Sequence, residues 1–202
     1  NGSPDFQQEQ WAMQECKDVG VPVPEILLIK YLMIGEKEYG FCLMKNMEGD
    51  LLDRGGIDFS NLNISEQKSY ISQAGEILSR IHSIPTDGFG RIIGDGKSQY
   101  SSLEQSFTSW VDKRDLYEAA AEEANLNLPI IRTAFQAGMN LKRKMFTIQP
   151  RLNHGDYFPK HLIVRKSKIV GILDWGEVRS DSPIYDFANW DFWVGKNFPI
   201  EW

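Results

Sequence analysis

The apolar residues near the start of the chain fall into two short runs, each of strand length. The runs cover 26–29 and 41–44, and the polar stretch 35–38 between them suits a hairpin turn. Before them, residues 5–19 read as a helix that ends at Gly20, because glycine adopts the left-handed backbone that closes many helices. The first part of the chain is therefore predicted to be a helix followed by a two-stranded hairpin.

Helical spacing dominates the middle of the chain. Asn63 and Glu66 match a capping box, and apolar residues then recur at the helical period. A Gly-rich loop is expected over 87–96, followed by one long helix over 103–125 and another over about 129–145. The middle of the chain is therefore predicted to be mostly helical.

A second hairpin is predicted late in the chain. The apolar runs 162–164 and 169–173 flank the polar turn 165–168. With the polar, Gly-containing stretch after the first hairpin as a boundary, residues 1–48 form a partial strand-bearing N-terminal lobe. Residues 49–202 form a mainly helical C-terminal lobe that carries the second hairpin, so the predicted fold class is α+β.

Composition narrows the range of partners. The 202 residues are 42% hydrophobic and carry a net charge of −6, which argues against nucleic acid as a partner. No apolar run approaches the roughly 18 residues of a membrane helix, and the first residues lack the features of a signal peptide. Cys16 and Cys42 show no metal or redox spacing and are predicted to be reduced core thiols. We therefore expect a cytoplasmic protein with no nucleic-acid or membrane partner.

Three residues around the second hairpin suggest chemistry. Asp156 lies in a tight His-Gly-Asp loop, His161 follows five residues later, and Asp174 ends the second strand of the hairpin. Phosphoryl transfer needs a carboxylate that accepts the proton of the attacking hydroxyl and ligands for a magnesium ion on the triphosphate. The hairpin can bring all three side chains to one point. Imidazole is a softer ligand than magnesium prefers, so only its position favours His161.

Three motifs in this order resemble the aminoglycoside phosphotransferase family. They are His154–Val164, Gly171–Glu177 and Asp181–Ala188. The resemblance implies a protein-kinase-like fold and phosphorylation of hydroxyl groups on small molecules. It also implies that Asp156 is the catalytic base and that Asp174 binds the metal.

His161 occupies the place where many members of that family have Asn. Macrolide kinases and 2″-acting aminoglycoside kinases are similar to this chain in having His there, so the difference does not by itself imply inactivity. Asp186 is retained, either as an anchor of the loop behind the metal site or in a direct role.

The resemblance extends to the nucleotide site. Glu9 looks like the helix glutamate that pairs with the nucleotide-binding lysine, with Glu15 as the alternative. The stretch around Lys45 and Met47 is similar to the hinge that holds adenine through main-chain groups. His82 is interpreted as structural. The implied cofactors are ATP or GTP with Mg²⁺.

The phosphate loop and the strand lysine, which precede the helix glutamate in this fold, have no counterpart before Glu9. The further helices that usually follow Asp186 are also missing, so we expect the sequence to be an incomplete record of a longer protein. A non-catalytic kinase-like nucleotide-binding module remains an alternative, as does a purely structural α+β domain.

The acceptor is less defined by the sequence. The predicted helix 103–125 is rich in acidic residues that would suit an amino sugar, although a solvated acidic surface explains them equally well. An aminoglycoside is therefore the leading small-molecule acceptor, ahead of a macrolide or another hydroxylated metabolite. The oligomeric state is not predicted.

Overall fold

The structure is a computed structural model, which describes residues 6–53, 56–145 and 148–194. The helices are α1 (Phe6–Asp18), α2 (Ile64–Ile81), α3 (Leu103–Val111), α4 (Arg114–Glu123), α5 (Leu128–Met145) and α6 (Ile184–Val194). The strands are β1 (Ile26–Ile34), β2 (Lys37–Met44), β3 (Asp50–Leu51), β4 (Phe89–Ile93), β5 (Lys97–Tyr100), β6 (Arg151–Asn153), β7 (Leu162–Arg165), β8 (Lys168–Ile172) and β9 (Arg179–Asp181). Short 3₁₀ turns cover Phe59–Asn61, Pro159–His161 and Trp175–Glu177.

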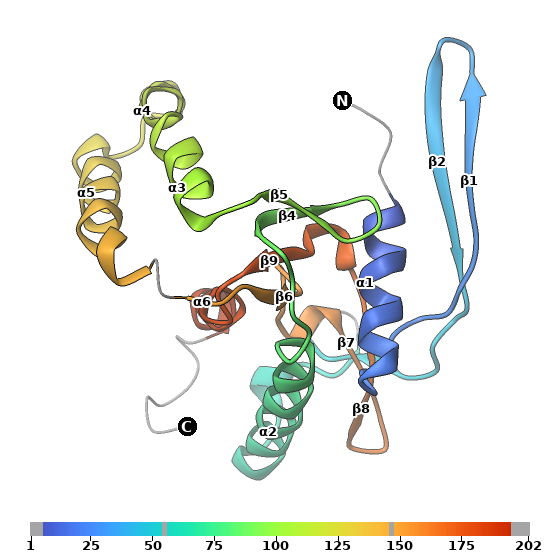
Figure 1. Cartoon of the computed structure of the whole chain (residues 1–202). Helices are drawn as coiled ribbons and strands as arrows, with labels where there is room; N and C mark the ends of the chain where they lie inside the picture. The colour runs from blue at the N-terminus through green and yellow to red at the C-terminus, as the bar shows by residue number, and fades with distance from the viewer. Residues whose placement is uncertain (1–5, 54–55, 146–147, 195–202) are drawn as a thin grey trace.

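The N-terminal part is the predicted helix and hairpin. Helix α1 buries Ala12, Met13 and Cys16, and Gly20 closes it with a φ of +77°. Strands β1 and β2 pair antiparallel over nearly their whole length, and this hairpin stands beside α1 in Figure 1. Its strands are longer than the apolar runs suggested, because the pairing continues on both strands up to the turn, as the partners Ile34 and Lys37 show.

Two small sheets organise the remainder of the chain. One has the order β3-β7-β8 and the other the order β5-β4-β9-β6. Figure 1 shows α2 below the β5-β4-β9-β6 sheet and to the left of β8, with α3 to α5 as a separate group at the left. The largest fully buried side chains come from these sheets and the segments around them: Trp175, Tyr157, Leu52, Ile81, Ile92, Leu152, Leu162 and Ile172. The core therefore lies directly behind the second hairpin, which is β7 and β8.

The predicted capping box of α2 is confirmed, but the prediction of a single helix over 103–125 is wrong. Asn63 and Glu66 bond reciprocally at the start of α2. The helix expected over 103–125 breaks at Asp112 and Lys113 into α3 and α4. After the break, α4 runs against α5, and Trp110 of α3 stacks on Phe135 of α5 at 4.3 Å between centroids. Helical periodicity does not reveal such a turn, because both halves keep the same period.

The prediction of a Gly-rich loop over 87–96 is also wrong. It contains β4, which pairs with both β5 and β9. Gly90 has a φ of +90° where the β4–β5 register shifts, so the glycine marks a bulge inside a strand. The turn residues hid a strand that pairs with β5 next to it in the sequence and with the distant β9.

The two cysteines differ in burial. Cys16 is fully buried, as predicted, whereas Cys42 is partly exposed and the prediction of a core thiol is wrong for it. Cys42 lies on β2, which has only β1 as a sheet partner in the described structure. Burial raises the thiol pKa of both residues. Among the described residues, no helix is both long and apolar enough to span a membrane.

Candidate active site

The His-Gly-Asp loop (His154, Gly155 and Asp156) follows directly from β6. Gly155 has a φ of +87°, and a Cβ at this position would lie 1.9 Å from the carbonyl oxygen of Glu177. Only glycine fits such a close backbone contact without displacing it. The loop is therefore locked against the 3₁₀ turn that follows Asp174.

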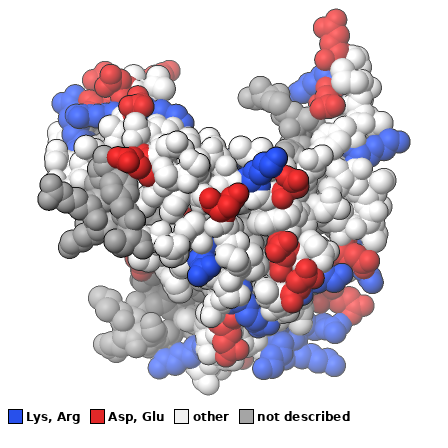
Figure 2. Space-filling model, in the orientation of Figure 1, with Lys and Arg blue, Asp and Glu red and all other residues white. Residues whose placement is uncertain are grey.

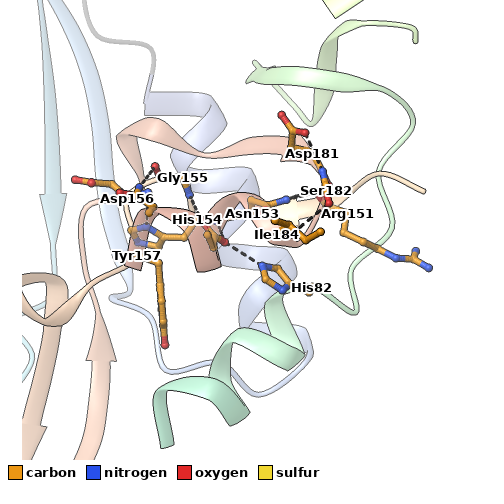
Figure 3. A network of polar contacts seen from close by, with 12 residues as sticks. His82, Arg151, Asn153, His154, Gly155, Asp156, Tyr157, Asp181, Ser182 and Ile184 are labelled. Atoms are coloured by element: carbon orange, nitrogen blue, oxygen red, sulfur yellow. Dashed lines mark hydrogen bonds and ion pairs between the residues drawn. The ribbon is translucent and has the colours of Figure 1, made fainter. Parts of the chain in front are cut away.

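Asp186 of α6 anchors this loop from behind. Its Oδ2 accepts a hydrogen bond from the His154 backbone N–H at 2.9 Å, and its Oδ1 accepts from Gly155 at 2.8 Å. His82 Nε2 lies 3.0 Å from Oδ2, and the Asn189 side chain donates to the Gly155 carbonyl. Figure 3 shows His82 reaching toward the loop from the end of α2, while Asp156 points away on the far side. The geometry supports an anchoring role for Asp186 and a structural role for His82.

His154 is a second internal support. Its side chain is fully buried, and Nε2 lies 3.0 Å from the Leu173 carbonyl oxygen, to which it can only donate. Nδ1 then accepts from the Asp156 backbone N–H at 3.3 Å. Because Nε2 donates and Nδ1 accepts, the ring is the neutral tautomer with its proton on Nε2, and burial lowers its pKa. It ties the His-Gly-Asp loop to the residue just before Asp174.

The structure brings Asp156, His161 and Asp174 together. One ligand atom from each lies within 4.8 Å of the others. His161 Nε2 is 3.2 Å from Asp174 Oδ2, and His161 Nδ1 is 3.7 Å from Asp156 Oδ2. His161 is nearly buried, whereas the Asp174 side chain is 61% exposed. The cluster is therefore rigid on its inner side and open to a ligand on its outer side.

The donor set of this cluster fits a divalent cation. His161 Nδ1 lies 2.8 Å from the main-chain oxygen of Asp156, which can only accept, so Nδ1 carries the proton. The lone pair of Nε2 then faces Asp174, as in histidines that ligate metals. Two carboxylates supply the oxygen donors that Mg²⁺ prefers. His161 and Asp174 could hold such an ion, with Asp156 beside it.

Backbone geometry fixes Asp174. Its φ of +64° is left-handed, which is uncommon for a residue with a side chain. The preceding Leu173 donates its N–H to the His161 carbonyl at 2.9 Å, so strand pairing continues up to the turn. The turn then directs the carboxylate of Asp174 back toward His161.

Glu9 of α1 approaches the same place from the N-terminal side. A Cβ on Gly176 would lie 3.9 Å from Glu9 Oε1 and 3.7 Å from Asp174 Oδ1, so the two carboxylates flank one glycine. Burial, and secondarily the charge of Asp174, raise the pKa of Glu9. Among the residues that the structure describes, no lysine or arginine lies within ion-pairing distance of Glu9.

The predicted hinge residues are not part of this group. Lys45 and Met47 follow β2 and line a cavity of about 600 Å³ together with the segment between α1 and β1. This cavity is lined by none of the four residues described above, which are Glu9, Asp156, His161 and Asp174. The Lys45 backbone N–H donates to the Glu25 carbonyl at 2.8 Å, so that donor already has a partner.

Sequence reasoning missed one charged residue at the site. Lys160 Nζ lies 3.5 Å from Asp156 Oδ2, four residues along the chain. The spacing of four residues between Asp156 and Lys160 indicates an ion pair only if the segment between them forms a helical turn. It does so in the 3₁₀ turn Pro159–His161, which Pro159 begins.

The acidic surface considered for the acceptor is partly neutralised. Glu118 on α4 pairs with Arg114 at 2.7 Å and with Arg132 of α5 at 2.8 Å. Hydrogen bonds from Arg132 and Arg114 lower the pKa of its carboxyl group. Figure 2 shows acidic and basic side chains interspersed on the described part of one face of the molecule. Glu118 is thus an internal tie between two helices.

Comparison with known proteins agrees with this arrangement. The family model described as "Phosphotransferase enzyme family" (APH) matches residues 2–202. A sequence comparison with the curated proteins finds no match.

Solved structures similar in fold include a thermostable mutant of aminoglycoside phosphotransferase APH(4)-Ia in a ternary complex with ADP and hygromycin B. Its TM-score is 0.71 at 18% identity, over 95% of this chain and 62% of that one. The ADP-bound aminoglycoside phosphotransferase APH(2″)-Ib has a TM-score of 0.59 at 18% identity, over 91% and 58%. The streptomycin–ATP–APH(2″)-IIa ternary complex has a TM-score of 0.58 at 18% identity, over 91% and 57%.

The chain thus spans about 62% of the length of the APH(4)-Ia structures that it matches. At this level of identity the likeness shows the fold, and it confirms the predicted α+β, protein-kinase-like class. The family model covers almost every residue. The chain therefore belongs to the phosphotransferase enzyme family.

Proposed function

We propose that the protein containing this chain transfers the γ-phosphate of ATP or GTP to a hydroxyl group of a small molecule. The observation that carries the proposal is the convergence of Asp156, His161 and Asp174 within 4.8 Å of one another. The anchored loop behind Asp156 supports it, because phosphoryl transfer depends on positioning rather than on covalent chemistry by the protein.

In this proposal Asp156 is the catalytic base. The acceptor oxygen forms a bond to the γ-phosphorus, the bond between that phosphorus and the bridging oxygen breaks, and its electron pair leaves with the nucleoside diphosphate. The hydroxyl proton passes to the Asp156 carboxylate. His161 and Asp174 would hold Mg²⁺, which when bound neutralises charge on the phosphate oxygens.

The nucleotide site is proposed from Glu9 beside Asp174 and from the separate cavity that Lys45 and Met47 line. Relatives in fold were solved with ADP or ATP, which supports a nucleotide here. The carbonyl of Lys45 and the main chain of Met47 would hold the base, because the Lys45 N–H already donates to Glu25. Glu9 would pair with the nucleotide-binding lysine. The half-buried Glu9 carboxylate supports this role, because a buried acid is costly without a positive partner.

An aminoglycoside is the proposed acceptor. The fold relatives include complexes with hygromycin B and streptomycin. With Glu118 paired, the exposed acids that remain for an amino sugar are Asp112, Asp115, Glu122 and Glu123. A macrolide or another hydroxylated metabolite is the alternative, and a cytoplasmic location is part of the proposal.

Acceptor phosphorylation by Asp156→Ala tests the central claim. We expect kcat to fall by at least about 100-fold because the proton acceptor is lost. Nucleotide affinity should stay within about two-fold, since Asp156 contacts the acceptor rather than the nucleotide. Mass spectrometry of the acceptor and calorimetry with ADP measure the two effects.

The matched control is Asp95→Ala, which removes an exposed carboxylate from the β4–β5 turn. It should leave kcat unchanged. Equal turnover by wild type and Asp156→Ala would remove Asp156 from the mechanism.

A non-catalytic nucleotide-binding module is the second candidate. His161, which stands where many members of the family have Asn, motivates this candidate. Such a module would bind nucleotide in the presence of magnesium and phosphorylate no acceptor. A panel of acceptors with γ-labelled ATP separates the two candidates.

A further inference from the structure

Lys160 is the charged residue in the site that the functions proposed above do not use. It lies in the 3₁₀ turn Pro159–His161, directly before His161. Its Nζ is 3.5 Å from Asp156 Oδ2, and its side chain is 23% exposed. A lysine this well covered is unusual, because the ammonium group is strongly hydrated.

Aromatic packing holds the ammonium group in place. Lys160 Nζ lies 4.1 Å from the centroid of the Phe158 ring, within the range of a cation–π contact. Phe158 in turn stacks on Trp193 of α6, with centroids 5.5 Å apart and planes 15° apart. The ring of Phe158 thus supports the ammonium group beside the Asp156 carboxylate.

The balance of charge around the site indicates a purpose for this arrangement. Asp156, Asp174 and Glu9 place three carboxylates near one point, and a nucleoside triphosphate would add further negative charge. Within the described ranges, Lys160 is the one lysine or arginine within 4.0 Å of any of these carboxylates. The Lys160 and Asp156 side chains are 23% and 26% exposed, and an ion pair that water can still reach adds little stability to the fold.

We propose that Lys160 is a further catalytic residue that contacts the γ-phosphoryl group during transfer. The inference rests on the phosphotransferase function proposed above. Before substrates bind, the ammonium group lies against Asp156. When the γ-phosphate arrives, the ammonium group donates to its non-bridging oxygens, and the Asp156 carboxylate becomes free to accept the hydroxyl proton.

In this step the acceptor oxygen bonds to phosphorus, and the nucleoside diphosphate leaves with the electrons of the broken P–O bond. Lys160 keeps its protons throughout. Its stabilisation is greatest when negative charge spreads over the phosphoryl oxygens, so it acts mainly on kcat.

Two substitutions test the proposal in the full chain. Lys160→Met keeps the length and apolar body of the side chain but removes the charge, and we expect kcat to fall about 100-fold. Affinity for ATP should fall about ten-fold while affinity for ADP stays within about two-fold, because only ATP carries the γ-phosphate. Lys160→Arg retains the charge and should recover most of both losses.

Lys168→Met is the matched control, since Lys168 is an exposed lysine at the start of β8. It should change neither kcat nor the ratio of ATP to ADP affinity. Lys160→Gln, measured alongside, replaces Lys160→Met if that variant does not fold.

The outcomes separate this inference from the proposed function. If the ratio of ATP to ADP affinity is unchanged in the charge-removing variants, the role of Lys160 is overturned. Equal losses of affinity for both nucleotides are one form of this outcome. If the wild type binds nucleotide but phosphorylates no acceptor, the proposed phosphotransferase function is contradicted. The ratio of ATP to ADP affinity then still decides whether Lys160 contacts the γ-phosphate. A wild type that binds neither nucleotide would overturn both.

Discussion

The His-Gly-Asp loop and the β1–β2 hairpin are held in place in opposite ways. Behind the loop, the backbone N–H groups of His154 and Gly155 donate to the fully buried carboxylate of Asp186. The hairpin rests on its own ladder and leaves large apolar side chains exposed, among them Met33 at 64% and Ile34 at 57%. The loop is fixed by buried hydrogen bonds, whereas the hairpin is fixed by strand pairing that is exposed to water.

The difference bears on how precisely each segment is positioned. A buried polar group is costly unless every bond is made, so the loop has one favourable conformation. A two-stranded ladder is marginally stable alone, and the hairpin also depends on α1, where the Phe6 N–H donates to the Tyr31 hydroxyl at 3.1 Å. Precision is greatest where proposed catalysis needs it.

Removing the buried anchor should have the largest effect on stability. Asp186→Ala leaves two buried N–H groups and His82 without their shared acceptor, and we expect a loss of about 3–5 kcal/mol in the free energy of unfolding. Urea denaturation followed by tryptophan fluorescence measures it. Asp191→Ala on the exposed side of the same helix is the control. A loss as small as that of the control would show that the loop does not depend on this anchor.

A pair of identical substitutions sharpens the comparison in apolar terms. Ile172 in β8 is fully buried and Ile34 in β1 is 57% exposed. Ile172→Ala should cost about 2–5 kcal/mol because it leaves a cavity. Ile34→Ala should change the free energy of unfolding by no more than about 0.5 kcal/mol. Equal losses in parallel urea titrations would mean that the hairpin is packed as tightly as the core.

The same contrast explains what the sequence could predict. Strand-length apolar runs and turn residues were enough for both hairpins, and the late hairpin was enough to bring Asp156, His161 and Asp174 together. Each of these inferences uses local pattern plus one short-range pairing. The roles assigned to the three residues, and the lobe boundary at residues 48–49, stay predictions.

Contacts between distant segments, and one local turn, account for what was missed. β4 was hidden because its partner β9 lies more than 80 residues away, as the pairing of Gly90 with Ser180 shows. The break between α3 and α4 lies next to Trp110, whose ring stacks on Phe135 of α5. Lys160 was overlooked because its approach to Asp156 depends on a single 3₁₀ turn. None of these has a periodic signature in the sequence.

The smallest expected effect belongs to a polar anchor that water can reach. Like Asp186, Glu118 ties separate partners together, but its side chain is 15% exposed and its partners are more so. Hydrogen bonds from Arg132 and Arg114 hold the pKa of Glu118 below its ordinary value of 4.5. A carboxyl group with a lowered pKa contributes stability above its unfolded pKa and loses that contribution as the pH falls through its folded pKa.

Glu118→Gln should therefore lower the Tm slightly at pH 7, and the gap from wild type should close as the pH falls below about 4.5. Circular dichroism melts at a series of pH values measure the gap, with Glu123→Gln on the same helix as the exposed control. A gap that stays constant down to about pH 3 would mean that the amide loses packing rather than charge. In that case the α4–α5 contact would resemble the buried core. The contrast between the buried anchor Asp186 and the water-accessible anchor Glu118 would then not hold.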